Sequence, residues 1–151
     1  MMTRESLRPA RPEEREAIES LLASNDLPTA DLPDDLGWLR CRDVDGERVA
    51  VGGLEPCGDH ALLRSVVVEP SVRGEGHGRA LCTALLAEAE REGFESVHLL
   101  TTTASGFFAD LGFETVPRES APEAVRNTTE FSDLCPDAAT CMRYDLADEG
   151  D

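Results

Sequence analysis

The sequence contains no lysine, and its 14 basic residues, all of them arginine, stand against 31 acidic residues, which gives a formal net charge of −17. Affinity for nucleic acid rests largely on Lys and Arg side chains that neutralise phosphates, so a surface this acidic repels DNA and RNA. We therefore expect no nucleic-acid partner. An excess of carboxylates also keeps a protein dissolved in concentrated salt, which favours the cytoplasm of a halophile as the source.

Long apolar runs are missing as well. No stretch approaches the roughly 20 apolar residues that span a bilayer, and the first residues, Met1 to Glu5, lead into no apolar segment of a signal peptide. We therefore expect a cytoplasmic protein with no membrane partner. The 151 residues suit one domain over residues 1–151, with a core at about 3–146 and an acidic tail at 147–151. The sequence leaves a homodimer open.

Patterns of metal ligands are absent too. The five cysteines include no CxxC pair and no Cys/His cluster with zinc-like spacing, so we expect free thiols and no metal. Cys135 and Cys141 leave open a site for a thiophilic ion such as arsenite, against the simpler interpretation of packed thiols. His60 and His98 have no evident partner in the sequence, and a single histidine in a strand is usually packed in the core.

What is present is an alternation of strand and helix patterns, which predicts an α/β or α+β domain. The dipeptide Asp45-Gly46 predicts a tight hairpin turn, because both residues tolerate a positive φ. Residues 25–36 contain two prolines and are a candidate loop or broken helix, and a candidate substrate lid. We expect strands at residues 3–8, 38–44, 48–54, 60–69, 94–100, 113–116 and 140–146, and helices at 12–23, 79–91, 103–111 and 121–134.

Glycines recur between the long apolar strand and the helix that follows it. Gly74, Gly76 and Gly78 leave backbone N–H groups uncovered by side chains, and the helix N-terminus adds a positive dipole end. Arg73 and Arg79 add local positive charge. This pattern predicts a cradle for a pyrophosphate group, and a tight connection that binds nothing remains the alternative. The turn lacks the Gly-Lys-Ser/Thr of a P-loop and the GxGxxG spacing of a dinucleotide site.

The segment Val66–Arg79 resembles the central motif of the GNAT superfamily of N-acetyltransferases, in which an Arg/Gln-x-x-Gly-x-Gly/Ala turn binds the pyrophosphate of coenzyme A. The segment Phe108–Phe113 resembles that family's second motif. The resemblance implies an α/β (α+β) fold with one mixed, mostly antiparallel sheet, splayed at its middle and flanked by helices, and acetyl-CoA as co-substrate. It implies cofactor contacts from the backbone at the splay, from the glycine turn, from the end of the following strand and from the second motif. These residues are Val66, Val67, Val68, Arg73, Gly74, Glu75, Gly76, His77, Gly78, Arg79, Thr102 and Phe108.

A narrower likeness runs from the first strand to Leu146. The segments Leu27–Leu32, Leu62–Ser65, Leu99–Ala104 and Phe131–Pro136 are similar to the arsenic-resistance N-acetyltransferases, which are related to the amino-acid N-acetyltransferases. This likeness implies a small-molecule amine substrate: the α-amino group of a glutamate-like amino acid, or of an analogue such as arsinothricin or phosphinothricin. It implies substrate contacts from Arg64, Ser65, Thr101 and Thr103.

Several of these roles have an alternative. Arg64 stands in an otherwise apolar strand, where a guanidinium needs an anionic partner. This partner is either a substrate carboxylate, bound bidentately, or a carboxylate of the protein. The threonines at 101–103 either contact pantetheine and substrate or cap the next helix. His77 either contacts phosphate or faces solvent.

No general acid or base can be assigned, so the catalytic residues stay unknown. Many members of the family carry a Tyr four residues before Gly-Phe to protonate the leaving thiolate, and this sequence has Phe108 there. The only tyrosine, Tyr144, lies in the last expected strand, where we expect a structural role, and Glu69 precedes Pro70 in a turn, where we expect a surface residue. Two alternatives stay open: a catalytically silent acetyl-CoA-binding sensor, and an enzyme for another amine such as a polyamine or a protein N-terminus.

Overall fold

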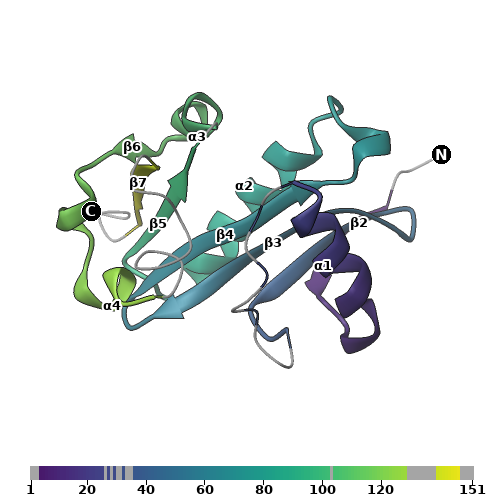
Figure 1. The fold of residues 1–151 in the computed structure, drawn as a ribbon, viewed down its shortest axis with the longest axis horizontal. Coiled ribbons are helices and arrows are strands. Elements are labelled where there is room, and N and C mark those ends of the chain that lie inside the picture. Colours follow the sequence, from purple (N-terminus) through teal and green to yellow (C-terminus); the bar gives the residue numbers. More distant parts are fainter. Residues whose placement is uncertain are drawn as a thin grey trace. The chain divides into compact units, whose positions relative to one another are not determined.

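The computed structural model describes residues 4–25, 27, 29, 32, 36–102, 104–128 and 139–146. Within this part of the chain, seven strands form a mixed, mostly antiparallel sheet in the order β1-β2-β3-β4-β5-β7-β6 (Figure 1). The expected fold class is therefore confirmed. The chain divides into two compact units, residues 1–53 with 65–85 and residues 54–64 with 86–151. Three elements contribute residues to both: β3 (Glu47–Cys57), β4 (His60–Val68) and helix α2 (His77–Arg91).

The first unit contains the predicted hairpin. Strand β1 (Glu5–Pro9) pairs antiparallel with β2 (Leu39–Val44), and β2 pairs antiparallel with β3. The β2–β3 connection is Asp45-Gly46, whose φ angles are 52° and 86°. Two successive positive φ angles define a type I′ turn, which matches the right-handed twist of the strands that it joins. The prediction of a tight hairpin at this dipeptide is confirmed.

Helix α1 (Arg15–Ala23) follows a single 3₁₀ turn, η1 (Pro12–Glu14), which begins with proline. Proline suits this position because the N–H that it lacks would have no partner in a first turn. The spacing of Ile18, Leu21 and Leu22 places these side chains on one helix face, and all three are buried. The core that they join also contains Ala10, Leu32, Leu36, Leu39, Cys41, Val51 and Val67.

The candidate lid, residues 25–36, is described only at positions 25, 27, 29, 32 and 36. Leu32 and Leu36 are buried in the core of the first unit, and Leu27 packs against it. These three leucines therefore take part in core packing. The other residues of the segment lie outside the described part of the chain.

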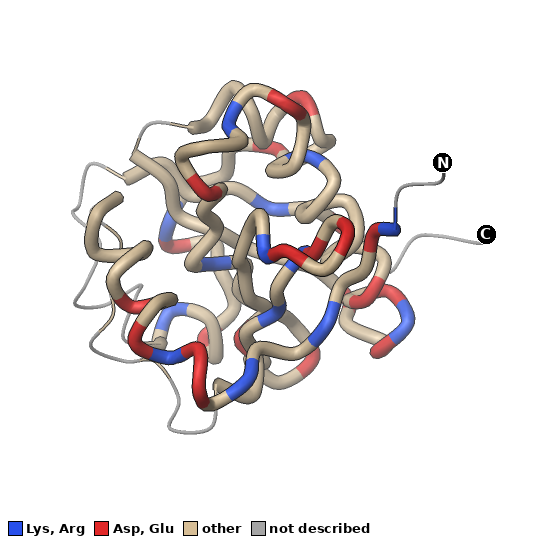
Figure 2. The backbone as a smooth tube through the Cα atoms, turned by 90° about the vertical axis from the view of Figure 1, so that its right-hand side faces the viewer, with Lys and Arg blue, Asp and Glu red and all other residues tan. Residues whose placement is uncertain are grey.

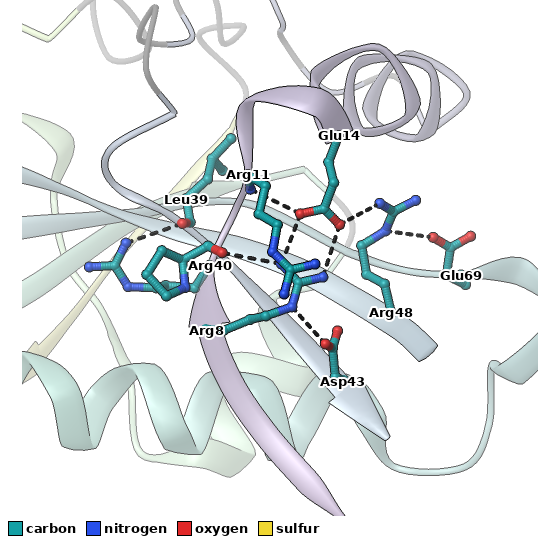
Figure 3. A network of polar contacts seen from close by, with 9 residues as sticks. Arg8, Arg11, Glu14, Leu39, Arg40, Asp43, Arg48 and Glu69 are labelled. Carbon is teal, nitrogen blue, oxygen red and sulfur yellow. Dashed lines mark hydrogen bonds and ion pairs between the residues drawn. The ribbon is translucent and has the colours of Figure 1, made fainter. Parts of the chain in front are cut away.

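A polar network joins the strands of the first unit to η1 (Figure 3). The carboxylate of Glu14 accepts hydrogen bonds from Arg8 Nη1 and Nη2 at 2.8 and 2.9 Å and from Arg48 Nη1 at 3.0 Å. Arg8 Nε also donates to Asp43 at 2.6 Å, and Arg48 Nε donates to Glu69 at 3.3 Å. The hydrogen bonds from Arg8, more than any other contact, lower the pKa of Glu14 to about 2. Glu69 is half-buried and is held in its ion pair with Arg48.

Basic and acidic positions are interspersed along the described backbone, without long stretches of one sign (Figure 2). With acidic residues in such excess, an arginine readily finds a carboxylate nearby. Much of the positive charge of the chain is therefore engaged by its own carboxylates. The arginines in such ion pairs include Arg8, Arg15, Arg42, Arg48, Arg64 and Arg143.

The second unit is centred on strand β5 (Ser96–Thr101), which pairs parallel with β4 and antiparallel with β7 (Thr140–Asp145). The β5–β7 ladder covers every residue of β5, so the register of these two strands is fixed along their length. The remaining elements of this unit are α3 (Ser105–Leu111), β6 (Glu114–Thr115), which pairs with β7, the 3₁₀ turn η3 (Arg118–Ser120) and α4 (Glu123–Arg126).

Helix α3 ends at Gly112, which has a φ of 113°. A Cβ at this position would lie 2.9 Å from Tyr144 Cε2, so both the backbone conformation and the close contact require glycine. The next residue, Phe113, is buried, and its ring centroid lies 5.3 Å from that of Tyr144. Tyr144 therefore has the structural role expected of it: it packs against the end of α3.

Helix α4 is shorter than predicted. Its last described turn is followed by Asn127 as C-cap and by Thr128, whose hydroxyl donates a hydrogen bond to a carbonyl of the helix at 2.7 Å. Asn and Thr side chains compete for backbone groups in this way and so disfavour further helical turns. Within the described residues, the helix predicted over residues 121–134 is therefore limited to α4, and the prediction is wrong at residues 127 and 128. Residues 129–138 lie outside the described part of the chain.

The described cysteines, Cys41, Cys57, Cys82 and Cys141, are free and buried. Burial raises the pKa of Cys41 to about 11 and that of Cys57 and Cys82 to about 12, so these thiols stay protonated at neutral pH. They are packed thiols, as expected. The alternative of an arsenite site depends on Cys135, which lies outside the described residues.

Candidate active site

The glycine turn lies between the 3₁₀ turn η2 (Pro70–Val72) and helix α2. Gly74 and Gly76 have φ angles of 82° and 88°, which side chains disfavour. A Cβ at either position would meet nothing within 4 Å, so the backbone conformation, and not crowding, requires glycine here. Both residues are exposed. The turn therefore presents bare backbone to solvent.

Helix α2 begins directly after this turn. The carbonyl of Gly76 accepts a hydrogen bond from the N–H of Ala80 at 3.0 Å. The N–H groups of His77, Gly78 and Arg79 precede this bond and so have no acceptor within the helix. The helix has 15 residues, and its dipole adds positive potential at these N–H groups. The helix starts two residues earlier than predicted, so His77 and Gly78 belong to its first turn.

The two arginines of the turn differ in their contacts. Arg73 Nε donates to the carbonyl of Val68 at 3.2 Å, and Arg73 Nη2 donates to Asn25 Oδ1 at 2.7 Å. This guanidinium therefore ties the turn to the end of β4. Arg79 is exposed in the first turn of α2. No sequence pattern marked Asn25, because it contacts Arg73 only through the fold.

His77 is oriented by two neighbours. Its Nδ1 accepts a hydrogen bond from Arg42 Nε at 3.3 Å, and its Nε2 lies 3.5 Å from Glu75 Oε1. A guanidinium can only donate, so the proton of the neutral ring is on Nε2 and faces the carboxylate. The side chain is only 11% exposed. The alternative in which His77 faces solvent is therefore wrong, and its backbone N–H remains at the helix N-terminus.

Strand β4 carries the three expected valines. Val67 is buried in the core of the first unit, and Val66 and Val68 are half-buried. Directly before them, Ser65 has a φ of 61°, an uncommon conformation for a non-glycine residue inside a strand. Its Oγ is buried and has no hydrogen-bond partner among the described residues. Ser65 therefore marks an irregularity in β4 at the place where the valines begin.

The ladder between β4 and β5 is short. Within the described residues it pairs His60–Leu62 with Ser96–His98 and then ends, although β4 continues to Val68 and β5 to Thr101. The backbone groups of β4 that follow are not engaged by this ladder.

Arg64 forms an ion pair with a carboxylate of the protein, which is one of the two anionic partners considered for it from the sequence. Its Nη1 lies 3.0 Å from Glu55 Oε1. The Arg64 side chain is fully buried, whereas that of Glu55 is 25% exposed. Glu55 was not predicted, because its contact with Arg64 depends on the β3–β4 hairpin.

The candidate residues after β5 have more structural roles. Thr101 Oγ1 accepts a hydrogen bond from the N–H of Ala104 at 3.0 Å, so it orders the turn that leads into α3. Thr102 is exposed, and Thr103 lies outside the described residues. Phe108 is buried, with its ring edge-on to those of Phe107 and Phe113.

Two properties of the described residues limit the chemistry further. No group of three or more His, Cys, Asp or Glu side chains in these residues is arranged to hold a metal ion. Every helix in the same part of the chain is too short or too polar to span a bilayer.

The fold is shared with solved structures of acetyltransferases. N-acetylglutamate synthase from Neisseria gonorrhoeae complexed with coenzyme A and N-acetyl-glutamate aligns with 97% of this chain at a TM-score of 0.81 and 19% identity. Its complex with coenzyme A and L-arginine aligns with 94% at 0.79 and 20% identity. Rv2747 from Mycobacterium tuberculosis in complex with CoA and NLQ aligns with 93% of this chain and 99% of its own length, at 0.79 and 24% identity.

These identities are low, so the likeness to the solved structures shows the fold alone. The chain spans 36% and 33% of the length of the synthase in its two complexes, about a third of that protein. The sequence itself matches the Acetyltransferase (GNAT) family over residues 2–113, which include the glycine turn and helix α3. The match covers well over half of the 151 residues. This chain belongs to the acetyltransferase (GNAT) family.

Proposed function

We propose that this chain transfers the acetyl group of acetyl-CoA to the α-amino group of a small glutamate-like amino acid. The use of acetyl-CoA as donor is supported by the exposed glycine turn at the N-terminus of α2, which has positive φ angles at Gly74 and Gly76. The solved structures with CoA named above support it. The N-acetyl-glutamate in one complex of the gonococcal synthase supports the acceptor half.

The glycine turn would hold the pyrophosphate of the donor. Bare N–H groups in the turn and in the first turn of α2 donate to phosphate oxygens, and the helix dipole favours their negative charge. Arg73 positions this turn, because its guanidinium is bound to Val68 and Asn25. Arg79 is exposed beside it and adds a cation to an acidic protein. The residues present therefore fit a coenzyme A pyrophosphate.

The donor supplies an activated thioester, and the chain supplies orientation. The irregularity at Ser65 and the early end of the β4–β5 ladder leave backbone groups of Val66–Val68 available to the pantetheine arm. Their N–H groups would orient the thioester and polarise its carbonyl. The Val67 side chain still packs in the core, so binding would use backbone atoms of a residue whose side chain contributes to stability.

Arg64 would recognise the acceptor. Its buried guanidinium pairs with Glu55 in this structure, and a substrate carboxylate bound bidentately would be a second anionic partner of the same group. Glutamate analogues such as arsinothricin or phosphinothricin retain the α-amino and α-carboxylate groups that such a site would use. Detoxification of an analogue of this type is therefore part of the proposal.

The acceptor screen is the direct test. Pure protein is incubated with acetyl-CoA and a panel of amines, and free thiol is followed over time. We expect glutamate-like amino acids to stimulate thiol release, and Arg64→Lys to raise KM for them roughly tenfold or more, because Lys cannot form the planar bidentate contact. KM for acetyl-CoA should not change. If no amine stimulates release, the proposed activity is wrong.

The donor site has a matched pair of variants. Gly76→Ala should weaken coenzyme A binding at least about tenfold, because the backbone N–H groups that it disturbs are each worth about 1 kcal/mol. Gly93→Ala, at a φ of 86° and also in open space, has the same backbone strain at the other end of α2 and should bind coenzyme A normally. Calorimetry measures both. Equal affinities of the two variants for coenzyme A would show that the glycine turn does not bind the donor.

One observation favours the sensor as a second candidate function. Phe108 stands where many family members have a tyrosine, and its ring is packed between Phe107 and Phe113, so no phenol is available there. Calorimetry that shows tight coenzyme A binding, together with no turnover on any amine of the panel, would favour a silent acetyl-CoA sensor over the enzyme.

A further inference from the structure

A chain of hydrogen bonds links two histidines through one serine in the second unit. Ser96 Oγ lies 2.7 Å from His60 Nδ1 and 2.8 Å from His98 Nε2. The two rings are edge-on, with centroids 5.7 Å apart. Ser96 and His98 are buried. His98 is packed as expected, and the partner that was not evident in the sequence is the serine between the two histidines.

The sheet register explains this arrangement. His60 on β4 lies opposite Ser96 on β5, which lies opposite Asp145 on β7. Two residues along β5, His98 lies opposite Arg143. Side chains two residues apart on a strand share a face. The pairing of three strands therefore brings polar groups together that are far apart in the sequence.

The hydrogen bonds fix where the protons lie. His98 Nδ1 is buried and has no partner among the described residues. An orphaned buried N–H is rarer than an orphaned acceptor, so the proton of His98 belongs on Nε2, which donates to Ser96 Oγ. The serine has one hydrogen, which it donates to His60 Nδ1. The remaining proton of the His60 ring is then on Nε2, and this N–H is left to donate to another group.

These residues line a cavity of about 280 Å³. Ligand pockets span roughly 300–1,000 Å³, so this volume suits a molecule of few heavy atoms. The cavity lies at the start of β5, whereas Thr101 is at its other end, five residues or about 17 Å away. We call it the Ser96 pocket; its lining consists of His60, Glu95, Ser96, His98, Ser120, Pro122, Arg143 and Asp145.

The charges of the Ser96 pocket are mixed. Arg143 supplies a guanidinium, held 3.1 Å from Asp145 Oδ1, and Glu95 supplies a second carboxylate. Burial lowers the pKa of His98 to about 4, so His98 stays neutral near pH 7. A simple anion would face two carboxylates and one guanidinium, and a simple cation would leave the donors of Arg143 and His60 unused. A ligand with one ammonium and one carboxylate group can pair with both the carboxylates and the hydrogen-bond donors of the pocket.

We infer that the Ser96 pocket binds a small free α-amino acid, with its carboxylate toward His60 and Arg143 and its ammonium group toward Glu95 and Asp145. This site is separate from the proposed acceptor site, which uses Arg64. It does not depend on whether the chain has acetyltransferase activity.

Calorimetric titration of the full chain, without acetyl-CoA, tests the inference. The probes are alanine, serine and glutamate, with ethylamine and propionate as the two half-ligands. We expect at least one amino acid to bind about tenfold or more tightly than either half-ligand, because a charge-assisted hydrogen bond contributes about one to two decades of affinity. No binding of any amino acid, or equal binding of ethylamine, overturns the inference.

Variants at the exposed rim locate the bound ligand. Asp145→Asn and Arg143→Gln should each weaken binding about 10- to 100-fold, and both side chains are exposed enough (48% and 37%) for the variants to fold. Asp110→Asn, an exposed carboxylate on α3 outside the pocket, is the control and should bind normally. Binding that survives both rim changes lies elsewhere, for example at Arg64, and overturns the inference.

Discussion

Glu14→Gln should destabilise the protein at neutral pH and lose most of this effect in acid. The carboxylate accepts hydrogen bonds from Arg8 and Arg48 and from the backbone N–H of Arg11 at 2.9 Å. These contacts lower its pKa from 4.5 to about 2 in the folded protein. Because the folded pKa is depressed, the stabilisation is fully present above pH 4.5 and is lost as the pH falls through 2.

The magnitude follows from the same two pKa values. The difference between 4.5 and about 2 corresponds to roughly 3 kcal/mol at pH 7, of which roughly 1 kcal/mol remains at pH 3. The Glu14 side chain is only 15% exposed, so solvent screens its ion pairs weakly. We therefore expect Glu14→Gln to be about 2 to 3 kcal/mol less stable than the parent at pH 7, and about 1 kcal/mol less stable at pH 3.

Urea denaturation at pH 7 and pH 3, followed by circular dichroism at one salt concentration, measures both differences. Urea is uncharged and leaves the ion pairs unscreened. Glu19→Gln is the control: its pair with Arg15, at 3.0 Å and 39% exposed, should contribute within about 0.5 kcal/mol at either pH. A loss of stability in Glu14→Gln that is the same at both pH values would refute the reasoning, because the carboxylate would then act through its shape and not its charge.

Two further predictions concern a buried histidine and two glycines. Burial lowers the pKa of His98 from 6.5 to about 4, so the unfolded chain binds a proton that the folded protein does not, and stability falls as the pH drops through this window. His98→Gln should flatten that fall by up to about 3 kcal/mol in urea titrations at pH 7 and pH 4, and an unchanged slope would contradict this assignment. Gly53→Ala places a Cβ 2.7 Å from Trp38 Cζ3 and should destabilise by about 1–3 kcal/mol. Gly106→Ala, in open space on α3, should stabilise by about 0.5–1 kcal/mol, and thermal melts that move in the same direction for both glycines would count against packing as the cause.

Local patterns were sufficient for most of the fold. The Asp45-Gly46 turn was predictable because its two positive φ angles are a property of the dipeptide itself. The end of α4 was not, because Pro122 signals a helix start strongly, whereas the competition from Asn127 and Thr128 is a weak stop signal. Starts and stops of helices are therefore predictable only where one residue type dominates the local energetics.

In the candidate site too, local features could be predicted from the sequence and contacts between distant residues could not. The glycine turn was predictable because it is contiguous in the sequence and its backbone conformation depends on its own glycines. The partners of Arg64 and Arg73 were not, because Glu55 and Asn25 reach them only through strand pairing and helix packing. For the Ser96 pocket, the sequence indicates only that Ser96 and His98 share one face of a strand. It does not indicate the strand register that places His60 opposite Ser96.

The chain has one tryptophan and one tyrosine, and they lie in different units. Trp38 packs against Gly53 in the first unit, and Tyr144 packs against Gly112 in the second. Each ring is therefore a built-in optical probe of its own unit: tryptophan fluorescence follows the first, and tyrosine absorbance follows the second. Denaturation curves that superimpose would show a single cooperative transition, and separate midpoints would show two units that unfold independently within one continuous sheet.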